Sequence, residues 1–588
     1  MKRSPGNAFI WAYLILKVLC CNALFSRLSL GKVALFWPRR LHLFTRDSSP
    51  KPNKRQFEGS PGNQTANKLL RNFQMKQPSV APEGDKFCQK SLLNETFANT
   101  YGKPTRVAYS PPIECGPLGS WAAVILSLTV TSKGNQYDRL GSIFLNGVEI
   151  MRTSTAEPTA QGIIWTIEKD ITKYMPLLAL SNTELVMELN NILDASLGIN
   201  AAYNVQLSAT YYVPTAGFPA PESADSIIPL SHPNSSVFSV PNAATTAVQI
   251  PDNAISASVE IYASGAAQEE FWYSNILDQA LQVINGNSTE TRDNPQKGPF
   301  REVQLWIDNQ LAGAAYPFPV IYTGGILLSW WRPLASYGSF DQPTYTIDIT
   351  PFLPLLTDSS THNFTLTVEG QGKNRSINSE WLLSGNIAIK RDPSGKRTTG
   401  KLLNYSTLST IQSSGQLCSS EVYLNVEANR KLSITSSIIP GSGAPRQDTM
   451  QQASGSSISQ TDSTETYSDQ FSFSLGLSLK RSNKGLQGSI SHSYNRALKP
   501  ATYNGFATSI QTNQSAIGLL SFDGNGKVKN GVGQTGQLFV YSDEKGYTFN
   551  RDYLIANETN ILKDFQSGLL ANNLNATHPQ LILARPGG

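Results

Sequence analysis

Residues 134–178 read GNQYDRLGSIFLNGVEIMRTSTAEPTAQGIIWTIEKDITKYMPLL. Two short runs of apolar and β-branched residues, 140–145 and 148–151, flank the pair Asn146-Gly147. This pair tolerates best the positive φ angles that a type I′ turn requires. The stretch therefore predicts a β-hairpin. The alternation of apolar and polar residues that follows the hairpin predicts a further strand with two distinct faces.

A carboxylate lies at each outer end of this hairpin. Asp138 comes just before the first strand, and Glu157 follows the second. Because paired antiparallel strands bring their outer ends together, we expect the two carboxylates to lie close together at the open end of the hairpin, called its mouth below. Paired acids exchange protons when burial and mutual repulsion separate their pKa values. Taken alone, Asp138 before Arg139 also suits a salt bridge or a turn, and Glu157 next to Pro158 also suits the end of a strand.

The end of the stretch recurs later in the chain. Residues 170–178, DITKYMPLL, match residues 348–356, DITPFLPLL. A hairpin with an Asn in its turn precedes each copy, and an alternating strand follows each. This repeat predicts two β-sandwiches of one topology, packed side by side. We expect an all-β protein with a first jelly-roll domain over 86–225 and a second over 226–395.

Two segments of the chain lack a counterpart in this repeat. The second unit carries an aromatic, Gly-rich insertion over 316–343, which is typical of a binding loop on a rigid sandwich. In it, Trp330 and Trp331 are neighbours, and because adjacent residues of a strand point to opposite faces, we expect at least one of them to leave the core. Residues 396–588 predict a further β-rich region, with a linker or long surface loop in the Ser-, Thr- and Gln-rich part over 433–465.

The N-terminal residues differ from the rest of the chain. Lys2 and Arg3 precede an apolar stretch over 8–25, so residues 1–45 are predicted to be a cleaved signal peptide or a type II membrane anchor. Residues 46–85 are polar and proline-rich, which predicts a disordered stalk. Either reading routes the body into the secretory pathway, secreted or tethered to a membrane with its body extracellular or lumenal.

Charge and histidine content exclude several classes of function. Residues 1–55 hold 11 of the 48 Lys and Arg and one acidic residue, so the net charge of +5 leaves about −5 on the rest. The body therefore gives no case for nucleic-acid binding. The five His form no spaced pair, so neither a His-based zinc site nor a Ser-His-Asp triad is supported. We expect no metal and no cofactor.

The cysteines and the sequons agree with a secretory route. Cys88 and Cys115 bracket the first strand region and are predicted to form a disulfide. The triplet Asn-x-Ser/Thr predicts N-glycosylation in such a protein. It occurs at Asn63, Asn94, Asn234, Asn287, Asn363, Asn374, Asn404, Asn513, Asn557 and Asn575.

Several long strings resemble one known family. They are DRLGSIFLNGVEIMRTSTAEPTAQGIIWTIEKDITKY over 138–174, QEEFWYSN over 268–275 and PFREVQLWIDNQLAGAAYPFPVIYTGGILLSWWRPLASYGSFDQPTYTIDITPF over 299–352. They resemble peptide N-glycanase A, the plant and fungal amidase that removes N-glycans from glycopeptides. The resemblance covers residues 86–400 and weakens beyond them.

The resemblance implies both a reaction and a place for it. It implies hydrolysis of the link between N-acetylglucosamine and asparagine in an N-glycopeptide or glycoprotein, leaving aspartate and a free glycan amine. It also implies two jelly rolls with the active site between them. Such a reaction needs an activated water, a proton for the departing nitrogen and stabilisation of the developing oxyanion.

Carboxylates with aromatic neighbours are the candidates for this chemistry. From the second unit, either Glu270 or Glu302 could complete the pair of acids, and Arg332 suits an oxyanion or sugar contact as well as an ion pair with Asp341. The catalytic candidates are thus Asp138, Glu157, Glu302, Glu270 and Arg332. An indole face suits the apolar face of a sugar, although a Trp in a β-sandwich is more often core. The substrate-binding candidates are Trp165, Trp272, Trp330, Trp331 and Arg139.

A second class of function fits the same fold. A cell-surface carbohydrate-binding protein could keep both sandwiches and bind glycans without turnover. Asp138 favours the enzyme, and the open choice of the second-unit acid keeps the binding protein as the alternative.

Overall fold

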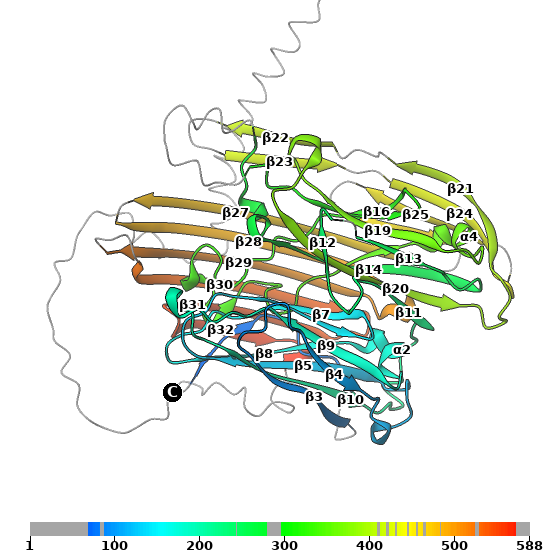
Figure 1. Ribbon diagram of the computed structural model, residues 1–588, viewed down its shortest axis with the longest axis horizontal. Coiled ribbons are helices and arrows are strands. Elements are labelled where there is room, and N and C mark those ends of the chain that lie inside the picture. Colours follow the sequence, from blue (N-terminus) through cyan, green and yellow to red (C-terminus); the bar gives the residue numbers. More distant parts are fainter. Residues whose placement is uncertain are drawn as a thin grey trace, which may run out of the picture. The chain divides into compact units, whose positions relative to one another are not determined.

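The computed structural model describes residues 69–82, 87–242, 244–278, 296–407, 412–418, 423–429, 432–443, 446–453, 457–462, 466–482, 484–523 and 528–571 (Figure 1). The chain divides into two compact units, one of residues 1–68 with 415–426 and one of residues 69–414 with 427–588. The described part of the first unit belongs to a two-stranded sheet of β22 (Gln412–Cys418) and β23 (Tyr423–Asn429). All that follows concerns the second unit.

The first sandwich packs a five-stranded sheet against a four-stranded one around a shared apolar core. The first sheet has the order β1 (Leu70–Arg71), β8 (Ile163–Asp170), β5 (Ala123–Ser132), β10 (Tyr203–Tyr212) and β3 (Phe87–Phe97). The second has the order β4 (Thr105–Tyr109), β9 (Thr183–Leu189), β6 (Leu140–Leu145) and β7 (Val148–Ser154). Apart from the short parallel pair β1–β8, the neighbouring strands are antiparallel.

The second sandwich repeats this arrangement. Its first sheet has the order β11 (Ser226–Leu230), β20 (Glu380–Arg391), β14 (Ala254–Ala266) and β18 (Tyr345–Asp348), with β12 (Phe238–Val240) also on β20. Its second has the order β13 (Thr245–Val248), β19 (His362–Glu369), β15 (Glu302–Ile307) and β16 (Gln310–Ala315). The order β8-β5-β10 thus corresponds to β18-β14-β20, and β9-β6-β7 to β19-β15-β16. The predicted pair of antiparallel sandwiches of one topology is confirmed, whereas their jelly-roll class stays a prediction.

The repeated Asp-Ile-Thr sequence has the same local role in both sandwiches. Asp170 Oδ1 accepts the Thr172 N–H at 2.8 Å, and Thr172 Oγ1 accepts the Val124 N–H of β5 at 2.8 Å. In the second copy, Thr350 Oγ1 accepts the Ala257 N–H of β14 at 3.1 Å. Each motif thereby ties the end of one strand to its neighbour and starts a short helical turn. These turns are η3 (Thr172–Tyr174) with α2 (Met175–Leu178), and η9 (Thr350–Phe352) with α4 (Leu353–Leu356).

The hairpin that decides the fold forms as predicted. Asn146 and Gly147 have φ angles of 50° and 80°, and β6 pairs with β7 from Leu145 opposite Val148 outward. The equivalent turn of the second sandwich has φ angles of 46° at Asp308 and 66° at Asn309. Two successive residues with positive φ are what a type I′ turn demands.

A ten-stranded antiparallel sheet, whose long strands are orange and red in Figure 1, follows the sandwiches in the sequence. Its β24 and β28 contribute Leu432, Ile434 and Ile490 to the core of the second sandwich. Its β30 and β31 place Phe539 and Tyr553 in a cluster with Ile125 of β5. Its strands, in order, are β21 (Thr399–Thr407), β24 (Leu432–Ile439), β25 (Arg446–Ala453), β26 (Ser457–Asp462), β27 (Thr466–Ser482), β28 (Gly485–Lys499), β29 (Thr508–Phe522), β30 (Val528–Asp543), β31 (Thr548–Ala556) and β32 (Asn560–Ser567).

This sheet confirms the predicted β-rich C-terminal region and corrects one part of it. The prediction of a linker or surface loop over 433–465 is wrong, because β24, β25 and β26 run through this range. Ser, Thr and Gln fill their ladders, and Ile434 and Ile438 of β24 are the alternate residues that reach the core.

The predicted stalk is wrong for residues 69–82. β1 pairs with β8, and β2 (Phe73–Gln74) pairs with β17 (Leu334–Ala335). Met75 and Val80 are buried against β5 and the C-terminal sheet. The rest of the predicted stalk, 46–68 and 83–85, and the apolar N-terminal segment lie outside the described residues. Of the helices that the structure does describe, none is long and apolar enough to cross a membrane.

The predicted disulfide is confirmed. Cys88 at the start of β3 bonds Cys115 in η2 (Ile113–Cys115), with the two Cα atoms 5.3 Å apart. The other short helices are η4 (Ala195–Leu197), η5 (Ala267–Glu269), η6 (Trp272–Ser274), η8 (Leu328–Trp330), η10 (Lys373–Arg375) and η11 (Thr502–Asn504).

Candidate active site

The outer ends of the β6–β7 hairpin are held together, as the sequence predicts. The Arg139 N–H donates to Thr155 Oγ1 at 2.8 Å, and the Thr155 N–H donates to the Arg139 carbonyl at 2.9 Å. The Tyr203 hydroxyl, from β10, donates to the Tyr137 carbonyl at 2.8 Å. These bonds place Asp138 and Glu157 side by side at one mouth.

A loop of the second sandwich closes this mouth at Thr323 and Gly324. Thr323 Oγ1 accepts the Glu157 N–H at 2.9 Å and donates to the Thr155 carbonyl at 3.1 Å. The Gly324 N–H donates to Asp138 Oδ2 at 2.5 Å. A Cβ on Gly324 would overlap Glu157 Oε1 and lie 2.8 Å from Asp138 Oδ2. Only glycine lets the backbone approach both carboxylates this closely.

A third carboxylate comes from the second sandwich. Glu270 follows η5, whose first residue Ala267 has a φ angle of 52°. Its charge interacts with those of Asp138 and Glu157, and no described residue donates a hydrogen bond to its carboxylate. The cluster of Asp138, Glu157 and Glu270, called the acidic cluster below, thus joins residues of both sandwiches.

Burial sets the protonation of the acidic cluster. It raises the pKa of Asp138 to about 6, although the Gly324 N–H and Arg139 favour its charged form. Burial, together with repulsion from Asp138, raises the pKa of Glu157 to about 7 against the pull of Arg332 and Arg139. Burial and the charges of the other two acids raise the pKa of Glu270 to about 7. Near neutral pH the cluster therefore holds protons and negative charge at once.

The neighbouring residue Glu269 has the opposite character. Arg301 Nε and Nη2 donate to its two carboxylate oxygens at 2.5 and 2.7 Å, and Trp381 Nε1 donates at 2.8 Å. Burial alone would raise its pKa, but these donors hold the pKa of Glu269 below its usual value. Fixed donors therefore hold Glu269 as a carboxylate, whereas Glu270 accepts no hydrogen bond from a described residue.

Two arginines flank the acidic cluster in different ways. Arg332 donates from Nη2 to the Glu157 and Pro158 carbonyls at 2.8 and 2.9 Å. Arg139 donates from Nη2 to Gln136 at 2.9 Å, and its buried Nε bonds no described residue. The alternative pairing of Arg332 with Asp341 is wrong, because Asp341 pairs with Lys76 and with Lys169 at 3.0 Å.

Glu302 lies apart from the acidic cluster. It is fully buried at the start of β15, opposite Glu369 of β19, and its carboxylate accepts a hydrogen bond from Gln304 Nε2 at 2.7 Å. Of the two second-unit acids that the sequence offers, the structure brings Glu270 to Asp138 and Glu157.

The four tryptophans predicted to bind substrate are buried and offer no ring face to a sugar. Trp165 stacks on Phe340 at 5.5 Å between ring centroids, and Trp272 packs against Trp381 at 5.9 Å. The expectation that Trp330 or Trp331 leaves the core is wrong, because both are 0% exposed. They belong to a helical turn rather than a strand, and the C-terminal sheet covers them.

Sequence reasoning missed Thr323 and Gly324, which join the two halves of the site. Their signal was present in the Thr-Gly-Gly of the aromatic insertion, within a string quoted for the resemblance. It also missed Tyr137, which precedes Asp138 and is 61% exposed. An exposed aromatic ring next to a half-buried acid is where a sugar would find a stacking partner.

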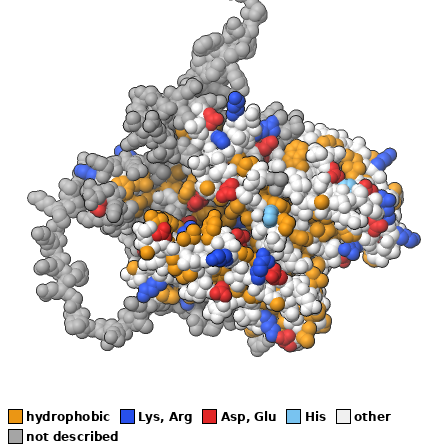
Figure 2. Space-filling view, in the orientation of Figure 1, with side chains coloured by type: hydrophobic (Ala, Val, Ile, Leu, Met, Phe, Trp, Pro, Cys, Tyr) orange, Lys and Arg blue, Asp and Glu red, His pale blue; other side chains and the backbone are white. Residues whose placement is uncertain are grey.

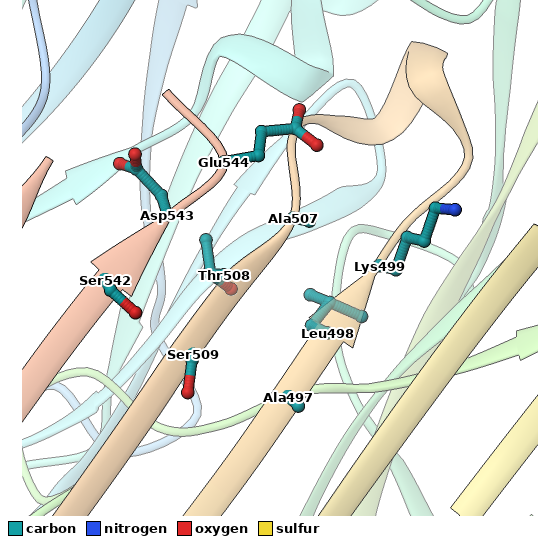
Figure 3. Close-up of a pocket in the computed structure, with 9 residues that line it drawn as sticks. All are labelled: Ala497, Leu498, Lys499, Ala507, Thr508, Ser509, Ser542, Asp543 and Glu544. Atoms are coloured by element: carbon teal, nitrogen blue, oxygen red, sulfur yellow. The ribbon is translucent and has the colours of Figure 1, made fainter. Parts of the chain in front are cut away.

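One face of the molecule carries mixed charge. On the face shown in Figure 2, basic and acidic side chains are interspersed rather than gathered into one patch. A separate open pocket lies at the ends of β28, β29 and β30, with Lys499 on one side and Asp543 and Glu544 on the other (Figure 3). It contains none of the acidic cluster. Within the described ranges, no group of three His, Cys, Asp or Glu has the geometry to hold a metal ion.

Fold and site together define a protein of two β-sandwiches of one topology, with an acidic site where loops of both meet. A sequence model of the family described as peptide N-acetyl-beta-D-glucosaminyl asparaginase amidase A matches residues 77–408. This chain belongs to that family, and the resemblance seen in its sequence is confirmed.

One curated relative and two solved structures add to this. The chain is 36% identical over 367 residues to peptide-N4-(N-acetyl-beta-glucosaminyl)asparagine amidase A of Prunus dulcis, covering 58% of this chain and 60% of the relative. It thus spans about three fifths of that relative's length. Structures of PNGF-II in space groups P21 and C2 each give a TM-score of 0.34, at 12% and 11% identity. They cover 52% of this chain and 66% and 65% of PNGF-II.

Proposed function

We propose that this chain is an amidase that hydrolyses the bond between N-acetylglucosamine and asparagine in N-glycopeptides and glycoproteins. It would release the N-glycan and leave aspartate. The acidic cluster is the observation that carries this proposal, because the reaction needs a base and an acid at one place. Family membership and the name of the Prunus dulcis relative support the same substrate class.

The acidic cluster supplies both proton transfers. Asp138, which has the lowest pKa of the three acids and accepts the Gly324 N–H, is the base that takes a proton from water. The water oxygen then bonds the amide carbon of the substrate asparagine. Glu157 or Glu270, protonated below a pH of about 7, gives its proton to the departing nitrogen. The C–N bond breaks, leaving a carboxyl group on the peptide and an amine on the glycan.

Arg139 is the better placed cation for the developing oxyanion. Both carbonyl contacts of Arg332 are to the backbone beside Glu157, which suits holding that segment. Arg139 donates a hydrogen bond from one nitrogen to Gln136, and the rest of its guanidinium makes no hydrogen bond to any described residue. Donors that are fixed before the reaction stabilise transition-state charge without reorganising.

The exposed ring of Tyr137 takes the sugar-stacking role that the buried tryptophans leave open. The Tyr203 hydroxyl bonds the Tyr137 carbonyl and fixes the backbone of the loop that carries this ring between β5 and β6. Tyr137→Ala should raise KM by roughly 5-fold or more at similar kcat, the scale of a lost aromatic contact. Tyr101→Ala, also on an exposed ring, is the matched control.

Mass spectrometry of a defined N-glycopeptide tests the activity. An amidase converts the glycosylated Asn to Asp, which retains one oxygen from ¹⁸O-labelled water. A carbohydrate-binding protein returns the glycopeptide unchanged while still retarding it on a column of immobilised chain. That second result would overturn the proposal.

The secretory route is part of the same proposal. The sequon residues that the structure describes are all exposed, which supports their glycosylation; they are Asn94, Asn234, Asn363, Asn374, Asn404, Asn513 and Asn557. Asn63, Asn287 and Asn575 lie outside the described residues. Expression in a eukaryotic host should give a secreted or membrane-bound glycoprotein, and an unmodified intracellular product would contradict the route.

A further inference from the structure

We propose that the C-terminal sheet is part of the active site, because it holds the Trp330–Arg332 turn that positions Glu157. The inference rests on the proposed amidase function for its kinetic consequence. The sheet lies almost entirely beyond residues 77–408, the range that the family model matches. The residues that carry the inference are called the cradle below: Gly518 of β29, Gly533 and Thr535 of β30, and Glu558 of the β31–β32 turn.

The η8 turn packs against the cradle so closely that there is almost no free space between them. A Cβ on Gly518 would lie 2.6 Å from Trp330 Nε1, and a Cβ on Gly533 would lie 3.0 Å from the Ser329 carbonyl oxygen. Thr535 Oγ1 donates to the Trp330 carbonyl at 2.6 Å. The two glycines and the Thr535 hydroxyl thus let Ser329 and Trp330, two successive residues of the turn, pack directly on the sheet.

From this turn, two contacts lead to the acidic cluster. Trp331 Nε1 donates to the Gly325 carbonyl at 2.7 Å, next to the Gly324 that binds Asp138. Arg332 bridges the Glu157 and Pro158 carbonyls from one nitrogen. Packing of the η8 turn on the sheet therefore fixes both Gly324, which lies between the carboxylates, and the backbone of Glu157. The buried tryptophans act as positioning residues.

A charge on the sheet faces the same arginine. Asn557 and Glu558 form the β31–β32 turn with φ angles of 52° and 65°, and the Asn557 N–H donates to the Gly533 carbonyl at 2.8 Å. This bond fixes the turn on the cradle. Glu558 Oε1 lies 3.9 Å from Arg332 Nη1, and the Glu558 side chain is 37% exposed, so the two residues form a partly solvated ion pair.

The inference takes Glu157, whose backbone Arg332 holds, as the acid that protonates the departing nitrogen, so the protonation of Glu157 should report on the cradle. The charged groups that act on it are Asp138 and Glu270 as anions, and Arg139 and Arg332 as cations. Moving Arg332 away removes a cation and raises the pKa of Glu157. Removing Glu558 leaves Arg332 less compensated and lowers the pKa of Glu157. The two kinds of variant should therefore shift the alkaline limb of the pH–rate profile in opposite directions.

The test uses the full chain with matched controls. Gly518→Ala and Gly533→Ala insert a methyl group against the turn. A Cβ on Gly536, also on β30, would instead lie 3.0 Å from the flexible tip of Leu554 and 3.5 Å from the Tyr553 carbonyl oxygen, so Gly536→Ala is the control. Glu558→Gln removes the charge at Arg332, whereas Glu544→Gln removes a charge at the other end of the sheet (Figure 3). Readouts are the melting temperature, kcat and KM against pH at low ionic strength, and hydrogen exchange of peptides over 155–160.

The inference expects three results. Gly518→Ala and Gly533→Ala lower kcat by about 10-fold, since small misplacements near the chemistry cost this much or more, and move the alkaline limb to higher pH. They also speed exchange over 155–160. Glu558→Gln moves the limb to lower pH with less than about 2-fold change in kcat at the optimum. Both controls match wild type.

Each other result has a definite meaning. Wild-type profiles and wild-type exchange in folded glycine variants overturn the inference. If the glycine variants do not fold, Glu558→Gln decides alone, and an unmoved limb overturns it. If wild type fails to release glycan, the proposed function falls, and the exchange of 155–160 in the glycine variants still decides whether the sheet positions this segment.

Discussion

At the scale of single residues, environment rather than residue type separates the acids of this protein. Glu269 and Glu270 are neighbours, yet Arg301 holds the pKa of one below its usual value while burial near two other acids raises the pKa of the other to about 7. The sequence names both residues but not their partners. The choice between Glu270 and Glu302 could not be made from the sequence, because it depends on which of them the fold brings to Asp138 and Glu157, far earlier in the chain.

Replacing Asp138 should remove the proposed base without disturbing the fold. In Asp138→Asn, the amide oxygen keeps an acceptor for the Gly324 N–H, but it cannot take a proton from water. We expect kcat to fall by roughly 100-fold or more, with KM within about 3-fold of wild type. Steady-state kinetics on a glycopeptide, together with a thermal melt, check this. Undiminished turnover would remove Asp138 from the mechanism.

Gly324 should accept no side chain. In Gly324→Ala, the new methyl group overlaps Glu157 Oε1 and crowds Asp138 Oδ2, so at least one carboxylate must move. We expect kcat to fall by roughly 100-fold, the scale of a 1 Å misplacement. Gly217→Ala is the control, since a Cβ there meets no heavy atom within 4 Å. Equal kinetics for the two variants would show that Gly324 has no role in placing the acids.

The proposed rate should depend on pH as a bell. Below a pH of about 6, Asp138 gains a proton and can no longer accept one from water. Above about 7, Glu157 and Glu270 lose the proton that the departing nitrogen needs. We expect kcat/KM to peak between these limits. A rate that rises steadily to pH 9 contradicts the assignment of a protonated acid.

At the scale of elements, short sequence motifs predicted correctly those turns and strand ends that depend on neighbouring residues alone. The Asn146-Gly147 turn and the Asp-Ile-Thr repeat depend on residues within a few positions, and both form as expected. Long-range packing decided the rest. Gln-rich strands such as β25 exist because neighbouring strands complete their ladders. Trp330 is buried because the C-terminal sheet covers it, and its contact with Thr535 there spans 205 positions.

The Asp-Ile-Thr motif should be a measurable source of stability. Thr350→Val keeps the shape of the side chain but leaves the buried Ala257 N–H without its acceptor. Such a loss costs about 1–3 kcal/mol. Thr166→Val, at an exposed Thr–Thr pair on the surface of the first sandwich, should cost less. Equilibrium denaturation of both variants checks this, and equal stabilities would show that the motif is dispensable.

At the scale of the whole molecule, a buried ion pair joins the sandwiches. Arg152 and Glu149 of β7 pair at 2.7 Å with both side chains 0% exposed. Arg152 Nη1 also donates to the Leu382 carbonyl of β20 at 2.7 Å, and the Ser384 hydroxyl donates to Glu149. The acidic cluster needs both sandwiches, so whatever holds them together also assembles the site.

Breaking this pair should be costly, and removing it whole should cost less. Arg152→Met leaves Glu149 buried without a cation, a loss of about 3–5 kcal/mol. The double variant Glu149→Gln with Arg152→Met removes the stranded charge and should recover part of that loss. Melting temperatures of the two variants and wild type check the order. A double variant less stable than Arg152→Met would contradict it.

The order in which the chain is made gives the cradle a further consequence. Asp138, Glu157, Glu270 and Arg332 leave the ribosome well before Gly518, Gly533 and Glu558, and sandwiches made first fold first. A nascent chain therefore carries its acids for many seconds before the sheet that seats the Arg332 turn exists, at a synthesis rate of about 5–20 residues per second. The chain would then become catalytically competent only after the last strands of the C-terminal sheet, β29 to β32, have been made. On the proposed secretory route, the proposed amidase would therefore be inactive while the sequons of its own chain are being glycosylated.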